Sequence, residues 1–268
     1  MSIANLPMYD LPEVTAANDA FWQAIARALE REGVAGVPPE LTRGVDLGEI
    51  WRDPDFLFGQ TCGYPLMNAF KGEMKVIATP VYDAPGCEGS DYCSHIVVRA
   101  DDPARDLSDL RGRTAAITHT ASQSGYSALR ATVAHLAHQG RFFGKVVESG
   151  GHPNSLALVA AGEADVCATD SVTHALLARH RPEALDGLRV LARSPAAPGL
   201  PYVTRAEADD DRLARLRGAL FAALEDPGLA SARAALLIAG AEILPETAYQ
   251  RIVDLERRAE ELGYAKVA

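Results

Sequence analysis

Short apolar runs alternate along the chain with longer segments in which apolar residues recur every three or four positions. Runs of the first kind predict buried strands, and segments of the second kind predict amphipathic helices. In the first hundred residues we expect a helix over 14–32 and strands at 2–8, 55–60, 74–79 and 95–99. Because strands alternate with helices, the pattern favours an α/β fold with mostly parallel sheets flanked by helices.

The pattern changes at residue 101, where a polar stretch is followed by three strand–helix units. The expected strands of these units are 114–118, 145–148 and 165–168, with helices from about 124, over 153–161 and over 171–180. Two more strands are expected at 188–192 and 200–204. The chain after 207 is predicted to be helical, with breaks at 226–228 and 244–245, where Pro and Gly interrupt it.

The polar stretch at Asp101 and the Pro- and Gly-rich segment 195–199 suggest that the chain crosses twice between two lobes. We expect lobe 1 to contain residues 1–98 and 195–268, and lobe 2 to be an insertion of residues 101–192. The hinge is then expected near 98–101 and 192–196. The alternative is one doubly wound sheet; two lobes are favoured because sheets of about four to six strands are commoner than sheets of eight.

The composition is that of an ordinary globular protein, with 48% hydrophobic and 23% charged residues among 268. The net charge of −10 disfavours nucleic acid as a partner, because neutralising phosphates needs clustered Lys and Arg. A small anionic ligand stays compatible, since helix ends supply a local positive field. No apolar run approaches the ~18 residues of a membrane helix, so no membrane segment is predicted.

The first ten residues, Met1–Asp10, have neither the basic start nor the apolar stretch of a signal peptide. For the sequence as given we therefore expect a cytoplasmic location. The alternative is a periplasmic location, if a leader has been trimmed.

The four cysteines, Cys62, Cys87, Cys93 and Cys167, form no Cys-x-x-Cys pair, so no zinc ribbon or other metal site is predicted. The spacing of Cys87 and Cys93 is compatible with two ordinary thiols. If the protein is exported, the expected disulfide joins Cys62 to Cys87, because both follow predicted strands of the same lobe.

The most informative motif is Thr118–Leu129 (THTASQSGYSAL), which follows a strand and opens a helix. Free backbone N–H groups at a helix start attract anions. Ser122 or Ser124 alone would suit a simple helix cap, but several small polar residues gather here with a glycine, which favours anion binding. The predicted ligand-binding residues of this segment are Ser122, Gln123, Ser124, Gly125 and Tyr126. Neither a Walker loop nor a dinucleotide fingerprint is present, and no cofactor is predicted.

Two further strand ends carry polar residues, His152 in 148–155 and Asp170 in 169–173. Ligands of open α/β sheets bind outside the carboxyl ends of strands, so both are predicted to bind the ligand. The alternatives are a solvated loop histidine and a helix-capping aspartate. From the other lobe, the residues predicted at the same kind of position are Tyr9, Gln60, Thr61 and Tyr64. A core aromatic is the alternative role of Tyr9.

Taken together, five short motifs resemble the phosphate/phosphite/phosphonate substrate-binding proteins of ABC transporters. They are Leu6–Asp10, Gly59–Pro65, Ser122–Tyr126, Gly151–His152 and Asp170–Val172. The resemblance covers the chain to about residue 205 and implies the two-lobed Venus-flytrap architecture of type II periplasmic-binding proteins. It further implies an oxyanion held near Ser122–Gly125, tyrosines Tyr9 and Tyr64 closing over it, and an ABC-transporter permease as partner if the protein is exported.

The predicted function is that of a solute-binding protein that closes around a small oxyanion or similar anionic metabolite, as a transporter component or a sensor, and not an enzyme. The alternative is a cytoplasmic enzyme that uses Cys62 as nucleophile, His152 as base and Asp170 as orienting group. None of the three lies in a nucleophile-elbow pattern, which disfavours the alternative.

Overall fold

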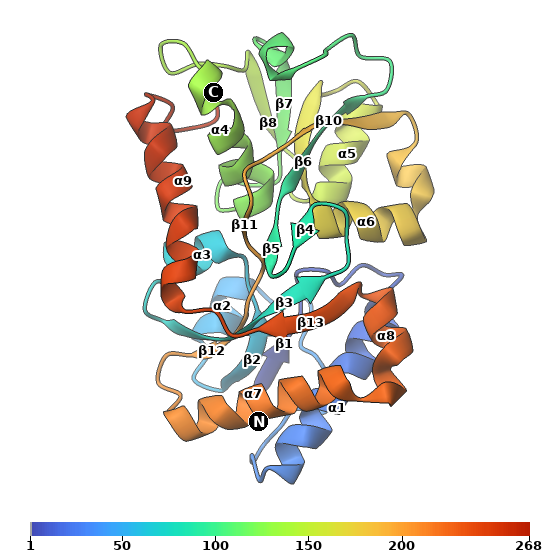
Figure 1. Ribbon diagram of the computed structural model, residues 1–268, viewed down its shortest axis with the longest axis vertical. Coiled ribbons are helices and arrows are strands. Elements are labelled where there is room, and N and C mark those ends of the chain that lie inside the picture. Colours follow the sequence, from blue (N-terminus) through green and yellow to red (C-terminus); the bar gives the residue numbers. More distant parts are fainter. Residues whose placement is uncertain (1) are drawn as a thin grey trace. The chain divides into compact units, whose positions relative to one another are not determined.

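The computed structural model describes residues 2–268, which form two compact units. The first unit contains the chain as far as Asp83 together with Gly199–Glu246. The second contains Ala84–Pro198 and Thr247–Ala268. Each unit is built around its own five-stranded sheet (Figure 1). The structure therefore has two α/β units, as predicted, and not one continuous doubly wound sheet.

The sheet of the first unit has the strand order β1-β2-β12-β3-β13. Its strands are β1 (Ile3–Asn5), β2 (Phe56–Gln60), β3 (Met74–Tyr82), β12 (Tyr202–Arg205) and β13 (Ile238–Glu242). Its helical segments are α1 (Thr15–Arg31), α2 (Leu47–Arg52), α3 (Gly63–Met67), α7 (Asp210–Glu225), η5 (Pro227–Leu229) and α8 (Ala230–Ala235). Only β1 and β2 are parallel; β12 runs antiparallel to β2 and β3, and β13 antiparallel to β3.

Helix α1 forms where the sequence predicts it, because Phe21, Trp22, Ile25 and Leu29 repeat at helical spacing and are all buried. Trp22 packs against Phe58 of β2, with ring centroids 5.6 Å apart. Burying each side chain of this size stabilises the fold by about 1.5–3 kcal/mol. The helix therefore anchors β2, whose carboxyl end carries two of the predicted ligand-binding residues.

The sheet of the second unit has the order β10-β6-β9-β7-β8. Its strands are β6 (Ser94–Arg99), β7 (Thr114–Ile117), β8 (Lys145–Glu148), β9 (Val166–Asp170) and β10 (Leu188–Arg193), beside a small sheet of β4 (Cys87–Glu88), β5 (Asp91–Tyr92) and β11 (Ala197–Pro198). Its helical segments are η1 (Leu107–Leu110), η2 (Gln123–Ser127), α4 (Ala128–Val133), η3 (Ala134–Leu136), α5 (His152–Ala160), α6 (Ser171–His180), η4 (Pro182–Leu185) and α9 (Gln250–Glu261). A short turn, η6 (Glu246–Tyr249), precedes α9.

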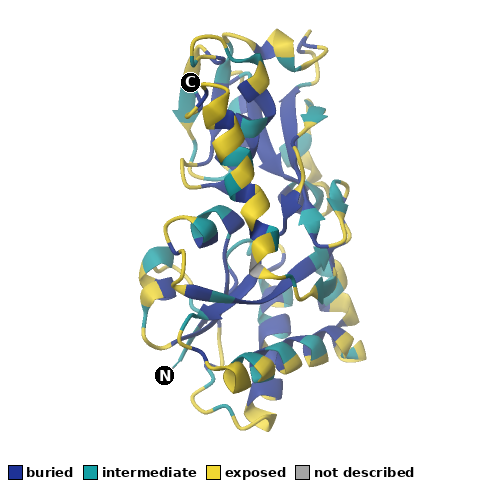
Figure 2. Cartoon of the chain, turned by 60° about the vertical axis from the view of Figure 1, so that its left-hand side comes forward, coloured by how far each residue is buried: buried dark blue, intermediate teal, exposed yellow. Residues whose placement is uncertain are grey.

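Both sheets are mixed, so the prediction of mostly parallel sheets is wrong in this detail. β7 is parallel to β8 and β9, as strand–helix–strand units require, but β6 is antiparallel to β9 and β10. Strand–helix alternation fixes a parallel direction only where a helix connects neighbouring strands. Strands that enter a sheet after the chain has visited the other unit, such as β12, are free of that constraint. Figure 2 shows that the strands of both sheets are largely buried, whereas the helices expose their outer faces.

The division into units differs from the predicted lobes, because residues 84–98 and 247–268 belong to the second unit. Strand β6 pairs with β9 and β10 in that unit, and α9 packs there on α4. The polar stretch at residue 101, predicted as a hinge, is a turn in which the buried carboxylate of Asp102 accepts the N–H of Ala104 at 2.8 Å. Polarity in this stretch therefore reflects a turn within one unit.

The C-terminal part is helical as predicted except at β13, which pairs with β3. The apolar run that leads into β13 is short, and periodicity alone does not distinguish such a run from a buried helix segment. Leu237, at φ 60, ends the preceding helix by taking the left-handed conformation. Among residues 2–268 no helix is both long and apolar enough to span a membrane.

Candidate functional site

The segment after β7 forms a single π-helical turn, η2, at the start of α4. Ser122 caps the turn: its Oγ accepts the N–H of Gly125 at 3.0 Å, and its carbonyl accepts the N–H of Ser127 at 3.0 Å. A Cβ on Gly125 would lie 2.3 Å from Oγ1 of Thr118, so only glycine fits this close approach. Turns of this kind occur frequently at functional sites.

Four polar side-chain atoms at or beside this turn are buried without a hydrogen-bond partner among the residues the structure describes. They are Oγ1 of Thr118, Oε1 of Gln123, Oγ of Ser127 and Nδ1 of His152. Leaving such a group unpaired costs about 1–3 kcal/mol, and most buried polar atoms in proteins are paired. At this turn the described residues therefore leave several hydrogen-bonding groups without a partner.

His152 begins α5 after β8 and reaches the turn: its Nε2 lies 2.9 Å from Oγ of Ser124, in a hydrogen bond. Burial, together with a contribution from the nearby His119, lowers the pKa of His152 to about 4, whereas the backbone carbonyl of Ala168 acts in the opposite direction. The imidazole is therefore neutral near pH 7 and can donate one hydrogen bond to a ligand without carrying a charge.

Asp170 ends β9 and caps α6, where its Oδ1 accepts the N–H groups of Val172 at 2.8 Å and Thr173 at 3.0 Å. It is 1% exposed. Asp170 pairs with Ser94 across β9 and β6, and Oγ of Ser94 donates to the carbonyl of Ser124 at 3.0 Å. The polar segments at the ends of β7, β8 and β9, which were identified separately in the sequence, therefore lie together. Asp170 caps α6, which is the alternative role considered for it in the sequence analysis.

In the first unit, Gln60 and Thr61 are engaged within the protein. The side-chain N–H group of Gln60 donates to Oη of Tyr82 at 3.1 Å and to the carbonyl of Leu200 at 3.0 Å. Thr61 is fully buried, and its hydroxyl donates to the carbonyl of Cys62 at 3.4 Å. Both residues therefore organise the end of β2, and their predicted contact with a ligand stays a prediction.

Two of the predicted tyrosines differ in environment. Tyr9 is 5% exposed and packs edge-on against Tyr82 at 5.1 Å between ring centroids, whereas Tyr64 is half-buried in α3. Tyr82 also interacts with Tyr202, whose pKa burial raises. The position of Tyr82 beside Tyr9 was not predicted, because the predicted strand ended at residue 79, whereas β3 continues to Tyr82.

The three residues of the alternative enzyme have separate roles in the structure. Sγ of Cys62, in the first unit, contacts Sδ of Met8 at 3.5 Å. In the second unit, His152 bonds to Ser124, and Asp170 caps α6. Each of these contacts gives its side chain a structural role.

None of the four cysteines, all within residues 2–268, forms a disulfide, so the predicted Cys62–Cys87 disulfide is wrong. The prediction assumed one lobe for both residues, but Cys62 precedes α3 in the first unit and Cys87 begins β4 in the second. Burial raises the pKa of Cys87 to about 11, and its Sγ lies 3.5 Å from Oγ of Ser171. Over the described part of the chain, no three His, Cys, Asp or Glu side chains are grouped so as to hold a metal ion.

The sequence of the chain matches a family model over residues 3–249, that of the periplasmic substrate-binding proteins of phosphonate ABC transporters. The chain belongs to this family. The resemblance seen in its motifs and the predicted solute-binding function are thereby confirmed at the level of the family, and the enzyme alternative is disfavoured. The members of this family are substrate-binding components of ABC transporters. No curated protein sequence matches the chain.

Several solved structures share the fold of this chain at sequence identities of 14–19%. PhnD1 of Prochlorococcus marinus, in complex with methylphosphonate, has a TM-score of 0.78 at 14% identity, over 97% of this chain and 98% of that one. A binding protein of an ABC phosphonate transporter from Pseudomonas aeruginosa has a TM-score of 0.77 at 19% identity, covering 98% and 87%. XAC2383 of Xanthomonas citri, bound to ATP, has a TM-score of 0.73 at 19% identity, covering 98% of both chains.

Proposed function

We propose that this protein binds a small oxyanion of the phosphonate or phosphate type at the turn η2 and releases it chemically unchanged. The observation that carries the proposal is the set of buried, unpaired groups around the turn that can donate a hydrogen bond, contributed by Thr118, Ser127 and His152. A tetrahedral oxyanion accepts several hydrogen bonds at once, and the start of a helix adds backbone donors and a fraction of positive charge. Membership of a phosphonate-binding family supports the same ligand class.

Ser124 and His152 are proposed to contact the ligand as a pair. Their mutual hydrogen bond fixes both side chains beside the turn, so little conformational entropy is lost when the ligand binds. Gly125 is proposed to serve by shape, because its missing Cβ lets the turn approach Thr118 closely. Tyr9 and Tyr64 in the first unit stay proposed ligand contacts, as do Gln60 and Thr61 at the end of β2.

The absence of turnover is part of the proposal. The hydrogen bonds of His152 and Asp170 orient the turn and cap α6, and neither prepares a nucleophile. We further propose that the protein acts in the periplasm and delivers its ligand to an ABC-transporter permease. The family description, which names a periplasmic substrate-binding protein of an ABC transporter, supports this role. Fractionation of cells that express the complete gene tests the compartment: recovery with cytoplasmic markers would contradict it.

The binding proposal is tested by calorimetry with methylphosphonate, phosphate, phosphite, sulfate and malate as probes. We expect saturable binding of at least one phosphorus oxyanion and a raised unfolding temperature in its presence. Phosphorus NMR of the same mixture after prolonged incubation should show the ligand intact. Binding of malate alone, or a new phosphorus signal, would contradict the proposal.

A matched pair of variants locates the site. Gly125→Ala places a methyl group against Thr118, whereas Gly218→Ala in α7 meets no atom within 4 Å. We expect the first variant to lose affinity for the oxyanion and the second to keep it. Equal affinities for the two variants would place the ligand away from η2.

A further inference from the structure

A second cavity, of about 400 Å³, lies in the second unit between α4 with η3, α9, and the segment after β10. Its apolar lining includes Leu107, Ala131, Ala134, Leu255 and Leu262. The alanines leave the space open, and Leu255 of α9 and Leu262, which follows this helix, flank it. Leu262 is 48% exposed and is one of four large apolar residues exposed in the described chain. The volume falls in the lower range of ligand pockets, about 300–1,000 Å³.

The basic residues that line this cavity are Arg193, Arg258 and His135, and no acidic residue lines it. Neither guanidinium has a hydrogen-bond or ion-pair partner within residues 2–268, unlike the other two arginines of α9. Arg251 binds the carboxylate of Asp91 with one N–O distance of 2.8 Å, and Arg257 lies 3.3 Å from Asp254. In a chain with 26 Lys and Arg against 36 Asp and Glu, two unpaired arginines line this one cavity and give it a local excess of positive charge. Arg193 also borders a neighbouring hollow that is lined by Glu88 and Asp91.

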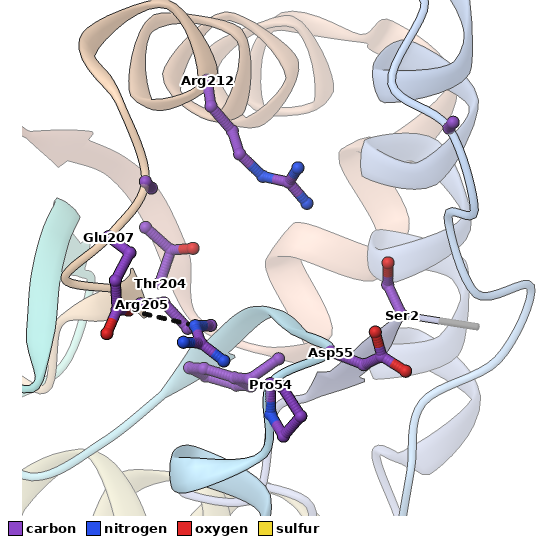
Figure 3. A pocket seen from close by; sticks show the side chains of 10 residues that line it. Ser2, Pro54, Asp55, Thr204, Arg205, Glu207 and Arg212 are labelled. Atoms are coloured by element: carbon purple, nitrogen blue, oxygen red, sulfur yellow. Dashed lines mark hydrogen bonds and ion pairs between the residues drawn. The ribbon is translucent and has the colours of Figure 1, made fainter.

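A hollow in the first unit provides a contrast. It has a volume of about 300 Å³ and is lined by Arg205, Arg212, Asp55 and Glu207 (Figure 3). There Arg205 already binds Glu207 at 3.1 Å, and acidic and basic side chains share the lining. That hollow therefore carries no excess of one charge, and its lining is polar, whereas the cavity beside α9 combines unpaired cations with apolar walls.

We propose that the cavity between α4 and α9 binds a small organic anion with an apolar body, such as an aromatic or short-chain carboxylate. The guanidinium groups of Arg193 and Arg258 supply donors that match a carboxylate. Leu255, Leu262 and Pro195 supply the apolar surface that the body of the ligand covers. None of the residues assigned to oxyanion binding lines this cavity, so the inference stands apart from the proposed function.

The test uses the full chain with methylphosphonate present in excess, so that the ligand sought is not the one bound at η2. Benzoate and hexanoate are titrated by calorimetry or protein NMR, with benzamide and hexanamide as neutral analogues of the same shape. We expect both acids to bind saturably below about 10 mM and both amides to bind at least about tenfold more weakly, since the amides lack the charge. Affinity for the acids should fall as salt concentration rises.

Variants then assign the site. R193Q/R258Q should weaken benzoate binding by at least about tenfold. The control is Arg257→Gln, because this neighbour on α9 is paired with Asp254 and does not line the cavity. Ala131→Leu fills the cavity and should abolish benzoate binding while the affinity for methylphosphonate stays unchanged.

Several outcomes would overturn the inference. They are amides that bind as tightly as acids, an unchanged benzoate affinity in the double arginine variant, or no saturation by benzoate at all. Because the comparison of acid with amide is made on the unaltered protein, it does not depend on the variants folding. A failure of methylphosphonate, phosphate and phosphite to bind would contradict the proposed function and leave this inference intact.

Discussion

Ser124 and His152 are 28 residues apart in sequence, yet Oγ of the first lies 2.9 Å from Nε2 of the second. The contact joins the turn after β7 to the start of α5 after β8. It is possible because β7 and β8 are parallel neighbours, so their carboxyl ends lie at the same edge of the sheet. The pair therefore holds a hydroxyl group and an imidazole in fixed positions at the start of a helix.

Replacing Ser124 by Ala removes the hydroxyl group of this pair. We expect the affinity for the best phosphorus oxyanion to fall by about tenfold to a hundredfold, corresponding to about 1.5–3 kcal/mol for a hydrogen bond to a charged group. Calorimetry is the measurement, and Ser231→Ala on the exposed face of α8 is the control. An affinity equal to that of the control would show that Ser124 only orients His152.

Gly125→Ala tests the packing of the turn in the absence of ligand. The added Cβ would lie 2.3 Å from Oγ1 and 2.6 Å from Cγ2 of Thr118. Overpacking of this kind costs about 1–3 kcal/mol, whereas Gly218→Ala in α7 should stabilise the protein by about 0.5–1 kcal/mol. Urea unfolding of the two variants measures both effects, and equal stability would mean that the turn relaxes freely around the methyl group.

Much of the candidate site around η2 could be predicted from the sequence, because it is formed by short segments whose residue types indicate their role. The hydroxyls and the glycine of 122–126 come a few residues after the apolar strand β7, and Asp170 is the last residue of the apolar strand β9. Helix α1 could be predicted for a similar reason: its apolar spacing is regular over its whole length.

What could not be predicted depends on partners far away in sequence. β13 is a strand because it finds the edge of β3, and residues 94–99 belong to the second unit because they pair with β9. Tyr82 joins Gln60 through a bond between two strands separated by β12. A single sequence carries no record of such pairings, so unit boundaries and the Cys62–Cys87 pair were predicted incorrectly.

The ion pair between Arg130 and Glu256 tests whether α9 is a structural part of the second unit. Nη2 of Arg130 lies 2.8 Å from Oε1 of Glu256, and Nη1 donates to the carbonyl of Ala265 at 2.7 Å. Arg130 is 2% exposed, so Arg130→Ala leaves a carboxylate and a carbonyl without their donor. We expect a loss of about 3–5 kcal/mol in unfolding free energy, against less than about 1 kcal/mol for Arg257→Ala in the exposed pair with Asp254. Similar small losses for both variants would mean that α9 adds little to the stability of the unit.

His95 predicts an acid-sensitive fold. It is 4% exposed, and burial lowers its pKa to about 4, with the charges of His174 and Arg193 acting in the same direction. Since its unfolded pKa is near 6.5, the unfolded chain binds more protons between these values, and stability falls as pH drops through this window. The loss below about pH 4 is on the order of 2–3 kcal/mol for this residue. Thermal unfolding at a series of pH values should show a flatter profile for His95→Gln, and an unchanged profile would assign the sensitivity to other groups.

The proton linkage of ligand binding follows from the position of His152. In the free protein its pKa is about 4, because burial disfavours the charged imidazolium. An oxyanion at the turn would favour the charged form and raise this pKa, so the complex holds more protons than the free protein at about pH 5. Affinity for a monoanionic ligand should therefore increase as pH falls from about 6 towards 4, as long as the fold persists. Calorimetry at about pH 5 in buffers of different ionisation enthalpy measures the proton uptake directly. We expect a fractional uptake in the unaltered protein and none in His152→Asn; a binding enthalpy independent of the buffer would place the anion out of electrostatic reach of His152.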